Sequence, residues 1–427
     1  MTTAQTIATL LALTALVGWI NARTVRAPLS VAFLTAGALS AGLLFVAQTL
    51  IGPFWGFDSV QAEIARLDFP ATVLGYLLAF LLFSGGMQVD LGEFRRRRLA
   101  IWSLATVGIV VSTVLVGIGA WGAAALVGLP LPLPWALVFG ALISPTDPVA
   151  VMANIRSGTL SPTLGVILQG EALFNDGVGL VAFTAALAFA SSGAAPDLLH
   201  EALTILVEVG GGLALGGVGG WAVGRLMRNL EDYFVELTLT LALAAGVYVL
   251  AQALHVSGAI AAGAAGLVVG SHSGRTGDGD ARGEAIRTFW HAIDEVLNGL
   301  LFLLLGLQIF IVPFESREVG VWAVAIVLVL AARLIVVLPW GAYFRVQHKE
   351  RAASLLLAWG GLRGAISLAL ALSIPEGGPK SLILSTTFAV VAFSVVAQGL
   401  TFGRLAAQMK RRTQGLPQSE SGNTMLH

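Results

Sequence analysis

The chain has 427 residues, of which 56% are hydrophobic and only 11% charged, and its net charge is zero. Soluble domains carry about 25% charged residues, so this composition excludes an ordinary soluble protein and predicts a membrane protein with many spans. A neutral chain gives no electrostatic case for binding nucleic acid, and the lack of cysteine excludes disulfides and thiolate metal sites.

Thirteen apolar segments have roughly the length of a membrane span, which predicts an all-α polytopic membrane protein. The first segment has no basic residue before it, unlike a signal peptide, so we expect it to remain as a span. The approximate bounds are 5–20, 28–51, 69–89, 99–127, 134–155, 163–190, 199–224, 233–254, 256–271, 287–312, 318–344, 351–374 and 381–403.

Positive charge alternates between the connecting loops. Nineteen of the 24 Lys and Arg residues lie in one set of loops, and three lie in the other. The positive-inside rule therefore predicts an extracellular N-terminus and a cytoplasmic C-terminus. Arginine far outnumbers lysine, as in GC-rich bacterial genomes, so we expect a bacterial inner membrane protein. We expect the basic and polar tail 405–427 to be disordered.

Prolines interrupt the fifth segment. Pro145 and Pro148 flank Thr146 and Asp147 at its middle. Each proline removes a backbone donor and clashes with the preceding turn, so half-helix ends are expected around Asp147. Non-helical backbone at that depth is tolerated only where protein or a water-filled cavity covers it.

Two acids and an amide, Glu171, Asn175 and Asp176, stand in the middle of the sixth segment. A carboxylate at the bilayer centre costs from about 3 to over 10 kcal/mol, and such residues mark ion paths, proton relays or buried ion pairs. On a helix Asn175 shares the face of Glu171, whereas Asp176 points about 140° away from Glu171. This pattern favours one structural ion pair plus one ion ligand over two equal ligands.

The twelfth segment holds Arg363 among three glycines, Gly360, Gly361 and Gly364, which weaken the helix there. A second arginine, Arg333, lies within the eleventh segment. One interrupted span thus carries an acid and another carries a base, seven spans apart. This arrangement is typical of inverted-repeat transporters, whose discontinuous helices frame an ion site near the midplane. Spans four to six would pair with spans eleven to thirteen.

Six runs along the chain are similar to the monovalent cation/proton antiporters of the NhaP/NHE branch. They are LLFSGGMQVDLGEFRR (81–96), SPTDPVAV (144–151), GEALFNDGVGLV (170–181), SGAIAAGAAGLVVG (257–270), FLLLGLQI (302–309) and GGLRGAISLAL (360–370). The resemblance implies a homodimeric, thirteen-span transporter of the NhaA/NhaP-like fold, with inverted repeats and two broken crossing helices.

The same resemblance implies two moving parts within a transmembrane domain of residues 1–404. A mobile core domain would slide like an elevator against a dimer scaffold embedded in lipid. The core would hold spans 99–190 and 318–403, the scaffold spans 5–89 and 233–312, and a linker span would occupy 199–224.

The resemblance also implies the ion ligands. Asp176 would be the main carboxylate for Na⁺ and H⁺, and Asp147 and the Thr146 carbonyl would approach the same ion. The family often has a serine after the glutamate, but this chain has Ala172, so that hydroxyl ligand is absent. Oxygen ligands suit Na⁺, and no cofactor, histidine or cysteine is needed.

Four further residues would hold the site together. Asn175 would hold the broken fifth span by hydrogen bonding, and Glu171 would pair with Arg363. Arg333 matches a second intramembrane arginine of the family, whose partner the sequence does not reveal. For the Glu171 pair and for Arg333 a structural role is favoured over a transport role, because a stranded buried charge costs about 3–5 kcal/mol.

The charges of the core suggest why exchange would be obligatory. Three ionised acids and two arginines leave one negative charge, which one Na⁺ or one H⁺ neutralises; a net charge crosses a low-dielectric barrier badly. Electrogenic relatives generally have an aspartate at the position of Asn175 and an intramembrane lysine. This chain has neither, so the resemblance implies one-for-one, electroneutral exchange.

The sequence therefore predicts Na⁺ (or Li⁺)/H⁺ antiport by alternating access rather than an enzyme. K⁺/H⁺ exchange by the same fold stays open. Three other classes are less favoured. A cation channel would need a filter loop, and an intramembrane hydrolase would need a nucleophile with its base, but the sequence shows neither. A transport-dead sensor would normally carry an added cytoplasmic domain, and the tail is too short for one. We interpret Glu208 as a dimer-face or cavity residue, and Asp294 and Glu295 as residues that snorkel rather than line the cytoplasmic funnel.

Overall fold

The computed structural model describes most of the chain as helices joined by turns and short loops. No strand occurs among the described residues, and a single antiparallel bridge pairs Asp147 with Leu362. This confirms the expected all-α class. The described residues are 3–51, 69–156, 158–192, 198–228, 230, 232–273, 281–310, 312, 314–347, 350, 352–377 and 379–414.

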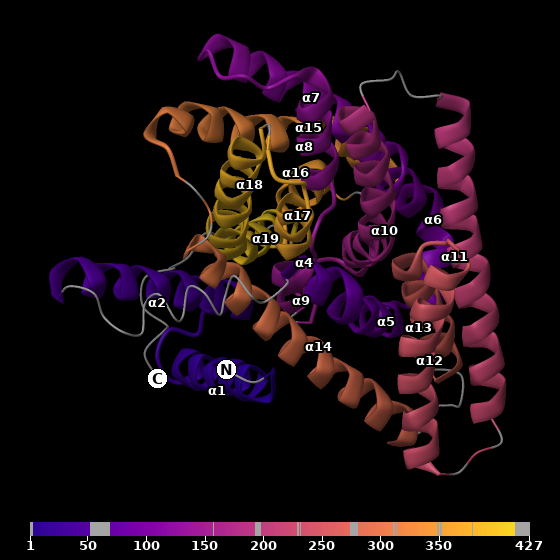
Figure 1. Cartoon of the computed structure of the whole chain (residues 1–427). Coiled ribbons are helices and arrows are strands. Elements are labelled where there is room, and N and C mark those ends of the chain that lie inside the picture. Colours follow the sequence, from indigo (N-terminus) through magenta and orange to yellow (C-terminus); the bar gives the residue numbers. More distant parts are fainter. Residues whose placement is uncertain are drawn as a thin grey trace.

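Each of the thirteen expected spans overlaps a helix or a helix interrupted by a short irregular segment (Figure 1). By length and composition, eight helices of the described residues could cross a membrane, and four shorter apolar helices accompany them. The chain is therefore a multi-pass membrane protein. The elements are α1 (Thr3–Arg23), α2 (Leu29–Ile51), α4 (Phe69–Ala71), η1 (Thr72–Leu77), α5 (Leu78–Gln88), α6 (Leu91–Ala105), α7 (Val107–Leu126), α8 (Leu133–Ile143), α9 (Val149–Arg156), α10 (Pro162–Ser192), α11 (Leu198–Met227), α12 (Tyr233–Ala253), α13 (Gly258–Ser273), α14 (Ala281–Leu307), η2 (Gln308–Phe310), η3 (Ser316–Glu318), α15 (Val319–Gln347), α16 (Ala353–Trp359), α17 (Ala365–Leu372), α18 (Lys380–Phe393), η4 (Ser394–Gln398) and α19 (Gly399–Gln414).

Two spans are broken where proline and glycine stand in the sequence. The fifth span divides into α8 and α9, and the twelfth into α16 and α17. The two irregular segments meet where the backbone N–H of Asp147 donates to the carbonyl of Leu362 at 2.8 Å, and we call this place the crossing. Both expected interruptions are thus confirmed, and each supplies a backbone partner to the other.

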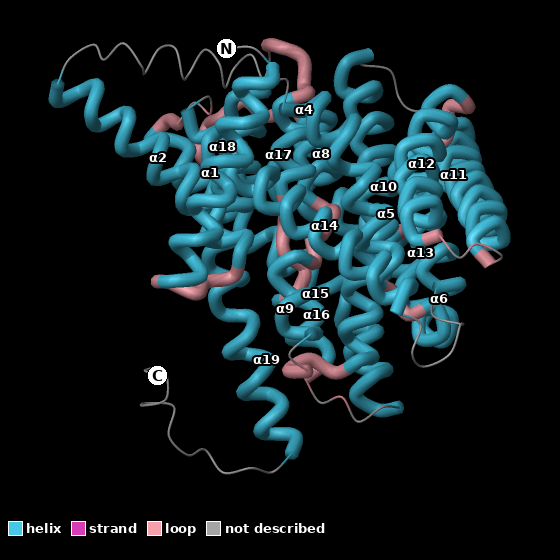
Figure 2. Tube along the Cα trace, turned by 90° about the horizontal axis from the view of Figure 1, so that it is seen from below, coloured by secondary structure: helices cyan, strands magenta, loops and turns pink. Residues whose placement is uncertain are grey.

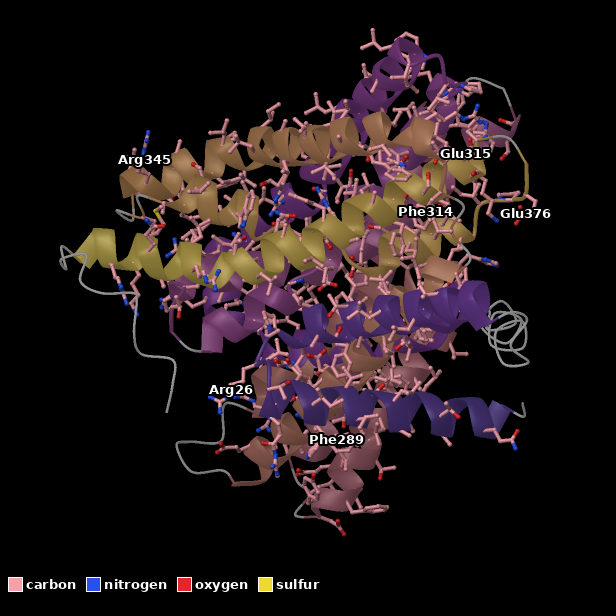
Figure 3. The ribbon with its side chains drawn as sticks, turned by 90° about the vertical axis from the view of Figure 1, so that its left-hand side faces the viewer. Arg26, Phe289, Phe314, Glu315, Arg345 and Glu376 are labelled. Atoms are coloured by element: carbon pink, nitrogen blue, oxygen red, sulfur yellow. The ribbon has the colours of Figure 1, made fainter. Side chains whose placement is uncertain are left out.

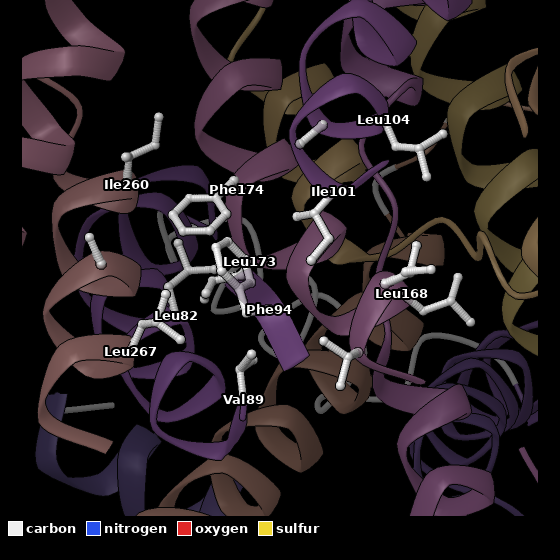
Figure 4. Close-up of a cluster of buried hydrophobic side chains, with 14 of the residues drawn as sticks. Leu82, Val89, Phe94, Ile101, Leu104, Leu168, Leu173, Phe174, Ile260 and Leu267 are labelled. Carbon is white, nitrogen blue, oxygen red and sulfur yellow. The ribbon is translucent and has the colours of Figure 1, made fainter. Parts of the chain in front are cut away.

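Buried apolar side chains form two clusters on opposite sides of this crossing. Side chains of α9 and α16 belong to one cluster, and side chains of α8 and α17 belong to the other. Figure 4 shows part of the first cluster, where Phe94 of α6 lies beside Phe174 of α10, with ring centroids 5.8 Å apart. The polar backbone of the breaks is therefore enclosed between two apolar layers, which keeps lipid away from it.

A group of glycine- and alanine-rich helices packs beside the crossing. α13 lies against α5 and α11, and α14 runs diagonally across the molecule to pack along α2 (Figure 1). A Cβ at Gly306 of α14 would lie 2.8 Å from the backbone nitrogen of Ala38 on α2, so only glycine allows this approach. Small residues of this kind drive helix association in membranes by letting backbones come close.

Two arginines and two glutamates in or beside the loops mark opposite sides of the molecule. In Figure 3, Arg26 and Arg345 lie toward one side of the molecule, and Glu315 and Glu376 lie toward the other. The helices run between these two sides. The two labelled arginines therefore lie on the same side, as the alternation of charge in the sequence predicts for their loops.

The segment after Arg404 departs from the expected disorder. α19 continues as a helix through Gln414 and extends away from the bundle (Figure 2). Phe402 and Ala406, four residues apart, are buried on one face, and Lys410 Nζ donates to the carbonyl of Gly158 at 2.7 Å. The predicted disorder is therefore wrong for residues 405–414, because it rested on their polar composition and not on the helical spacing of Phe402 and Ala406. Residues 415–427 lie outside the described part of the chain.

Candidate functional site

Asp147 lies in the gap between α8 and α9, where Pro145 and Pro148 prevent a regular helix. Its Oδ1 accepts a hydrogen bond from the Val149 N–H at 2.9 Å, at the start of α9. A Cβ at Gly364 would lie 2.9 Å from Cγ of Asp147, so glycine is required for the second break to approach this carboxylate. Asp147 is only partly buried and keeps one oxygen for another partner.

Asn175 ties the first break to α10. Its Nδ2 donates to Oγ1 of Thr146 at 2.7 Å and to the Thr146 carbonyl at 3.3 Å. Both residues are buried. The amide side chain thus holds the Thr146 carbonyl, which lies where the helix is interrupted, and this is the contact that the resemblance implied.

The Arg363 side chain donates hydrogen bonds to backbone carbonyls rather than pairing with a carboxylate. Its Nη1 donates to the carbonyls of Ser144 and Pro145, the latter at 2.8 Å, and its side chain is buried. These carbonyls belong to the C-terminal end of α8, where unpaired carbonyls and the helix dipole attract a cation. The base of the second break therefore stabilises the irregular backbone of the first.

Glu171 pairs with Arg333, and the expected pair of Glu171 with Arg363 is wrong. Nη1 and Nη2 of Arg333 contact Oε1 and Oε2 of Glu171, the second pair at 2.9 Å, in a buried two-pronged arrangement. Arg333 Nε also donates to the Leu357 carbonyl at 3.2 Å. Spacing along α10 gives the direction of Glu171, but only the packing of α15 against α16 decides which arginine stands there.

A cavity of about 90 Å³ contains both aspartates of the motifs. Ala172 also faces it, so the wall has a methyl group where the family often has a hydroxyl. No lysine, arginine, histidine or cysteine occurs among the lining residues. The polar lining residues are Gln88, Thr146, Asp147, Gln169, Asp176, Asp294, Asn298 and Ser367.

The cavity extends from the aspartates toward the face with basic loops. Gln88 is the last residue of α5, just before the arginine-rich start of α6, and Met152 lies one turn before the end of α9. Gln169 Nε2 lies 2.9 Å from Sδ of Met152, which joins α10 to α9 along this wall. The opposite side of the crossing is filled by the second apolar cluster.

Asp294 corrects a sequence-based expectation, because it lines the cavity rather than snorkelling. Asn298, one turn further along α14, lines the cavity as well. The spacing of four residues places two polar side chains on one helix face, a signal that the sequence offered. Glu295 is exposed and lies 3.7 Å from His291. Glu208 does not line this cavity.

Comparisons with known proteins agree with this geometry. Residues 11–408 match the family described as sodium/hydrogen exchanger, transmembrane. The chain is 37% identical to the Na⁺/H⁺ antiporter NhaP of Pseudomonas aeruginosa over 412 residues, which cover 94% of this chain and 96% of that protein. It is 34% identical to the Na⁺/H⁺ antiporter NhaH of Halobacillus dabanensis, with 82% and 85% covered.

The fold is likewise similar to a solved structure of the sodium proton antiporter MjNhaP1 from Methanocaldococcus jannaschii. The TM-score is 0.71 at 20% sequence identity, with 96% of this chain and 98% of that chain covered. This likeness shows a shared fold. Together with the family match over almost the whole sequence, it confirms the resemblance seen in the motifs, and the chain belongs to the sodium/hydrogen exchanger family.

Proposed function

We propose that the protein exchanges Na⁺ or Li⁺ for H⁺ across a membrane, one for one, by alternating access. The observation that carries this proposal is a cavity lined by three carboxylates and no cationic side chain. The nearby arginines contact Glu171 and the carbonyls of Ser144 and Pro145 instead. A cavity of this charge and oxygen chemistry suits a small hard cation.

Asp176 is the carboxylate that we assign to the exchanging ion. Asp147 already uses Oδ1 to accept the Val149 N–H, whereas no hydrogen bond to Asp176 is found among the described residues. A proton or a Na⁺ would therefore compete for the Asp176 oxygens. The free oxygen of Asp147 and the Thr146 carbonyl would add further ligands, and water would replace the hydroxyl that Ala172 lacks.

The charge balance supports one-for-one exchange. Within the proposed core domain, Glu171 and Arg333 neutralise each other in their buried pair. Among the described residues Arg363 pairs with no carboxylate, but its charge would offset that of one of the two core aspartates, Asp147 and Asp176. One negative charge would remain in the core, and one Na⁺ or one H⁺ would cancel it; Asp294 would stay behind on the scaffold. Moving the neutral, loaded site through the low-dielectric interior costs less than moving the charged, empty one, so each crossing would carry a cation.

For the moving parts, we propose that α6–α10 and α15–α19 form the core domain. The scaffold would comprise α1–α5 and α12–α14, and α11 would link the two. The placement of the cavity supports this division, because Asp147 and Asp176 belong to one group of helices and Asp294 belongs to the other. Sliding of one group against the other would then change which side the cavity faces.

We also propose a homodimer in the inner membrane of a bacterium, embedded in lipid, with the N-terminus outside and the C-terminus in the cytoplasm. The placement of Arg26 and Arg345 on the same side supports this orientation. On α1, Leu16 is 51% exposed and Trp19 is 59% exposed. A second copy or lipid would cover this apolar surface.

Purified protein in proteoliposomes tests the proposed function. An internal pH dye follows H⁺ movement driven by Na⁺, Li⁺ or K⁺, with and without a clamped membrane potential, for the wild type and Asp176→Asn. We expect a response to Na⁺ and Li⁺ that ignores the potential and falls by more than about 100-fold in the variant. A response to K⁺ alone would change the substrate. A signal that survives in a folded Asp176→Asn protein would remove Asp176 from its role.

A further inference from the structure

The last span is interrupted by a π-helical turn close to the second break. This turn, η4, joins α18 to α19, and the Gly399 N–H donates to the Ser394 carbonyl five residues back. π-helical turns are rare, cost regular hydrogen bonding, and occur often at functional sites. Ser394 and Gln398, the first and last residues of this turn, are each 2% exposed.

These two side chains hold both ends of the break between α16 and α17. Ser394 Oγ accepts the backbone N–H of Arg363 at 2.8 Å and donates to Gln398 Oε1 at 2.6 Å. Gln398 Nε2 donates to the carbonyl of Trp359 at 3.1 Å. A carbonyl at the end of α16 and an N–H before α17 are groups that a broken helix leaves without a partner, and one continuous chain of hydrogen bonds supplies both.

The first break is held in the same manner by a different residue type. There Asn175, on the helix that follows the broken span, donates to Thr146. At the second break Ser394 and Gln398 again lie on the helix that follows the broken span. Each crossing segment therefore has a buried polar clamp from the next helix in the chain.

The second clamp reaches the cation site through the backbone. Ser394 fixes the N–H of Arg363, and the preceding residue, Leu362, accepts the N–H of Asp147. The Arg363 side chain in turn holds the Pro145 carbonyl, two residues before Asp147. Neither Ser394 nor Gln398 lines the cavity, so any effect on the ion must pass through this backbone.

We propose that Ser394 and Gln398 are positioning residues that set the distance of Asp147 from the exchanged cation. This inference rests on the proposed antiport function. Loss of the clamp would let the segment 360–364 shift, and the Asp147 oxygens would move with it. The consequence would be weaker Na⁺ binding in a protein that still folds and still moves its core.

The test measures Na⁺ and Li⁺ KM and maximal rate in proteoliposomes for Ser394→Ala, Gln398→Leu and the conservative Ser394→Thr. A matched control is Thr401→Val: Thr401 lies on α19 and accepts the Trp359 indole N–H at 2.9 Å, but its side chain is exposed. We expect Ser394→Ala and Gln398→Leu to raise the Na⁺ KM by about five- to tenfold and to change the Li⁺/Na⁺ KM ratio. Ser394→Thr and Thr401→Val would stay within about twofold of the wild type.

A second readout does not depend on transport. Na⁺-induced thermal stabilisation of the detergent-purified protein reports cation affinity directly, and its midpoint would shift with KM. An unchanged midpoint and KM in folded Ser394→Ala would overturn the proposal, as would equal losses in Ser394→Thr and Ser394→Ala. If Gln398→Leu does not fold, the comparison of Ser394→Ala with Ser394→Thr still tests the proposal. Failure of the proposed function would differ, because the wild type itself would then show no Na⁺-driven H⁺ movement.

Discussion

The two broken spans solve the same backbone problem with opposite chemistry. Prolines open the break between α8 and α9, and its charged residue, Asp147, faces the cavity. Glycines open the break between α16 and α17, and its charged residue, Arg363, turns to the carbonyls of the other break. Proline removes donors and leaves carbonyls unpaired, whereas glycine leaves room for a neighbour, so the base can serve the break that the prolines created.

The comparison shows that charge within the membrane has two distinct uses here. Glu171, Arg333 and Arg363 are buried and paired with protein groups, so their charges hold the crossing together. Asp147 and Asp176 keep access to the cavity. We therefore expect substitutions of the first set to lower stability and substitutions around the second set to change ion affinity.

The largest expected effect concerns the Glu171–Arg333 pair. Glu171→Gln leaves a buried guanidinium without its counter-charge and should destabilise the fold by about 3–5 kcal/mol. Adding Arg333→Gln should restore much of this loss, whereas adding Arg363→Gln should not. Thermal unfolding in detergent, followed by tryptophan fluorescence, measures both double variants. Recovery with Arg363→Gln instead would reinstate the Glu171–Arg363 pair that the resemblance implied.

A pair of glycine variants separates the two uses of charge within the second break. A Cβ at Gly364 would press on Asp147, and a Cβ at Gly361 would lie 2.9 Å from Cζ of Arg333. We expect Gly364→Ala to raise the Na⁺ KM by at least about tenfold, and Gly361→Ala to lower the melting temperature with a smaller change in KM. If the two variants changed the Na⁺ KM and the melting temperature by the same amounts, the distinction between stabilising and ion-binding charges would be contradicted.

Removing the clamp of the first break should have an intermediate effect. Asn175→Ala deletes both hydrogen bonds to Thr146 and leaves buried polar groups unpaired, at a cost of about 1–3 kcal/mol. Stability should fall and the Na⁺ KM should rise. Thr184→Val is the control on the same helix, because Thr184 only bonds the Val181 carbonyl one turn back. A normal KM in Asn175→Ala would mean that Thr146 does not contribute to the site.

The smallest expected effect concerns Asp294, which lines the cavity from α14 rather than from either broken span. Asp294→Asn removes one negative charge from the lining, so the local Na⁺ concentration falls and the KM should rise about threefold at low salt. The difference should vanish as ionic strength increases. Glu295→Gln, at the exposed neighbouring position, serves as the control. An effect of Asp294→Asn that persists at high salt would indicate direct coordination of the ion.

Much of the architecture is predictable from local chemistry. Apolar length gives the thirteen spans, alternating positive charge gives a shared basic face, and proline or glycine inside a span marks each break. The role of Asn175 at the first break followed instead from the resemblance to the NhaP/NHE branch, because helix geometry alone gives only the face that Asn175 shares with Glu171. The spans, the alternation of charge and the positions of the breaks need only the period of a helix, the thickness of a bilayer and the geometry of single residues.

Tertiary packing decided the rest. The sequence shows that Glu171 needs a buried base, but the choice between Arg333 and Arg363 depends on how α15 and α16 approach α10. The role of Asp294 depends on the diagonal course of α14, and the clamp of Ser394 and Gln398 depends on a π-helical turn without a local signal. The period of a helix gives the direction of a side chain, whereas the partner that it meets is set by how distant segments pack, as with Arg333, which lies 162 positions from Glu171.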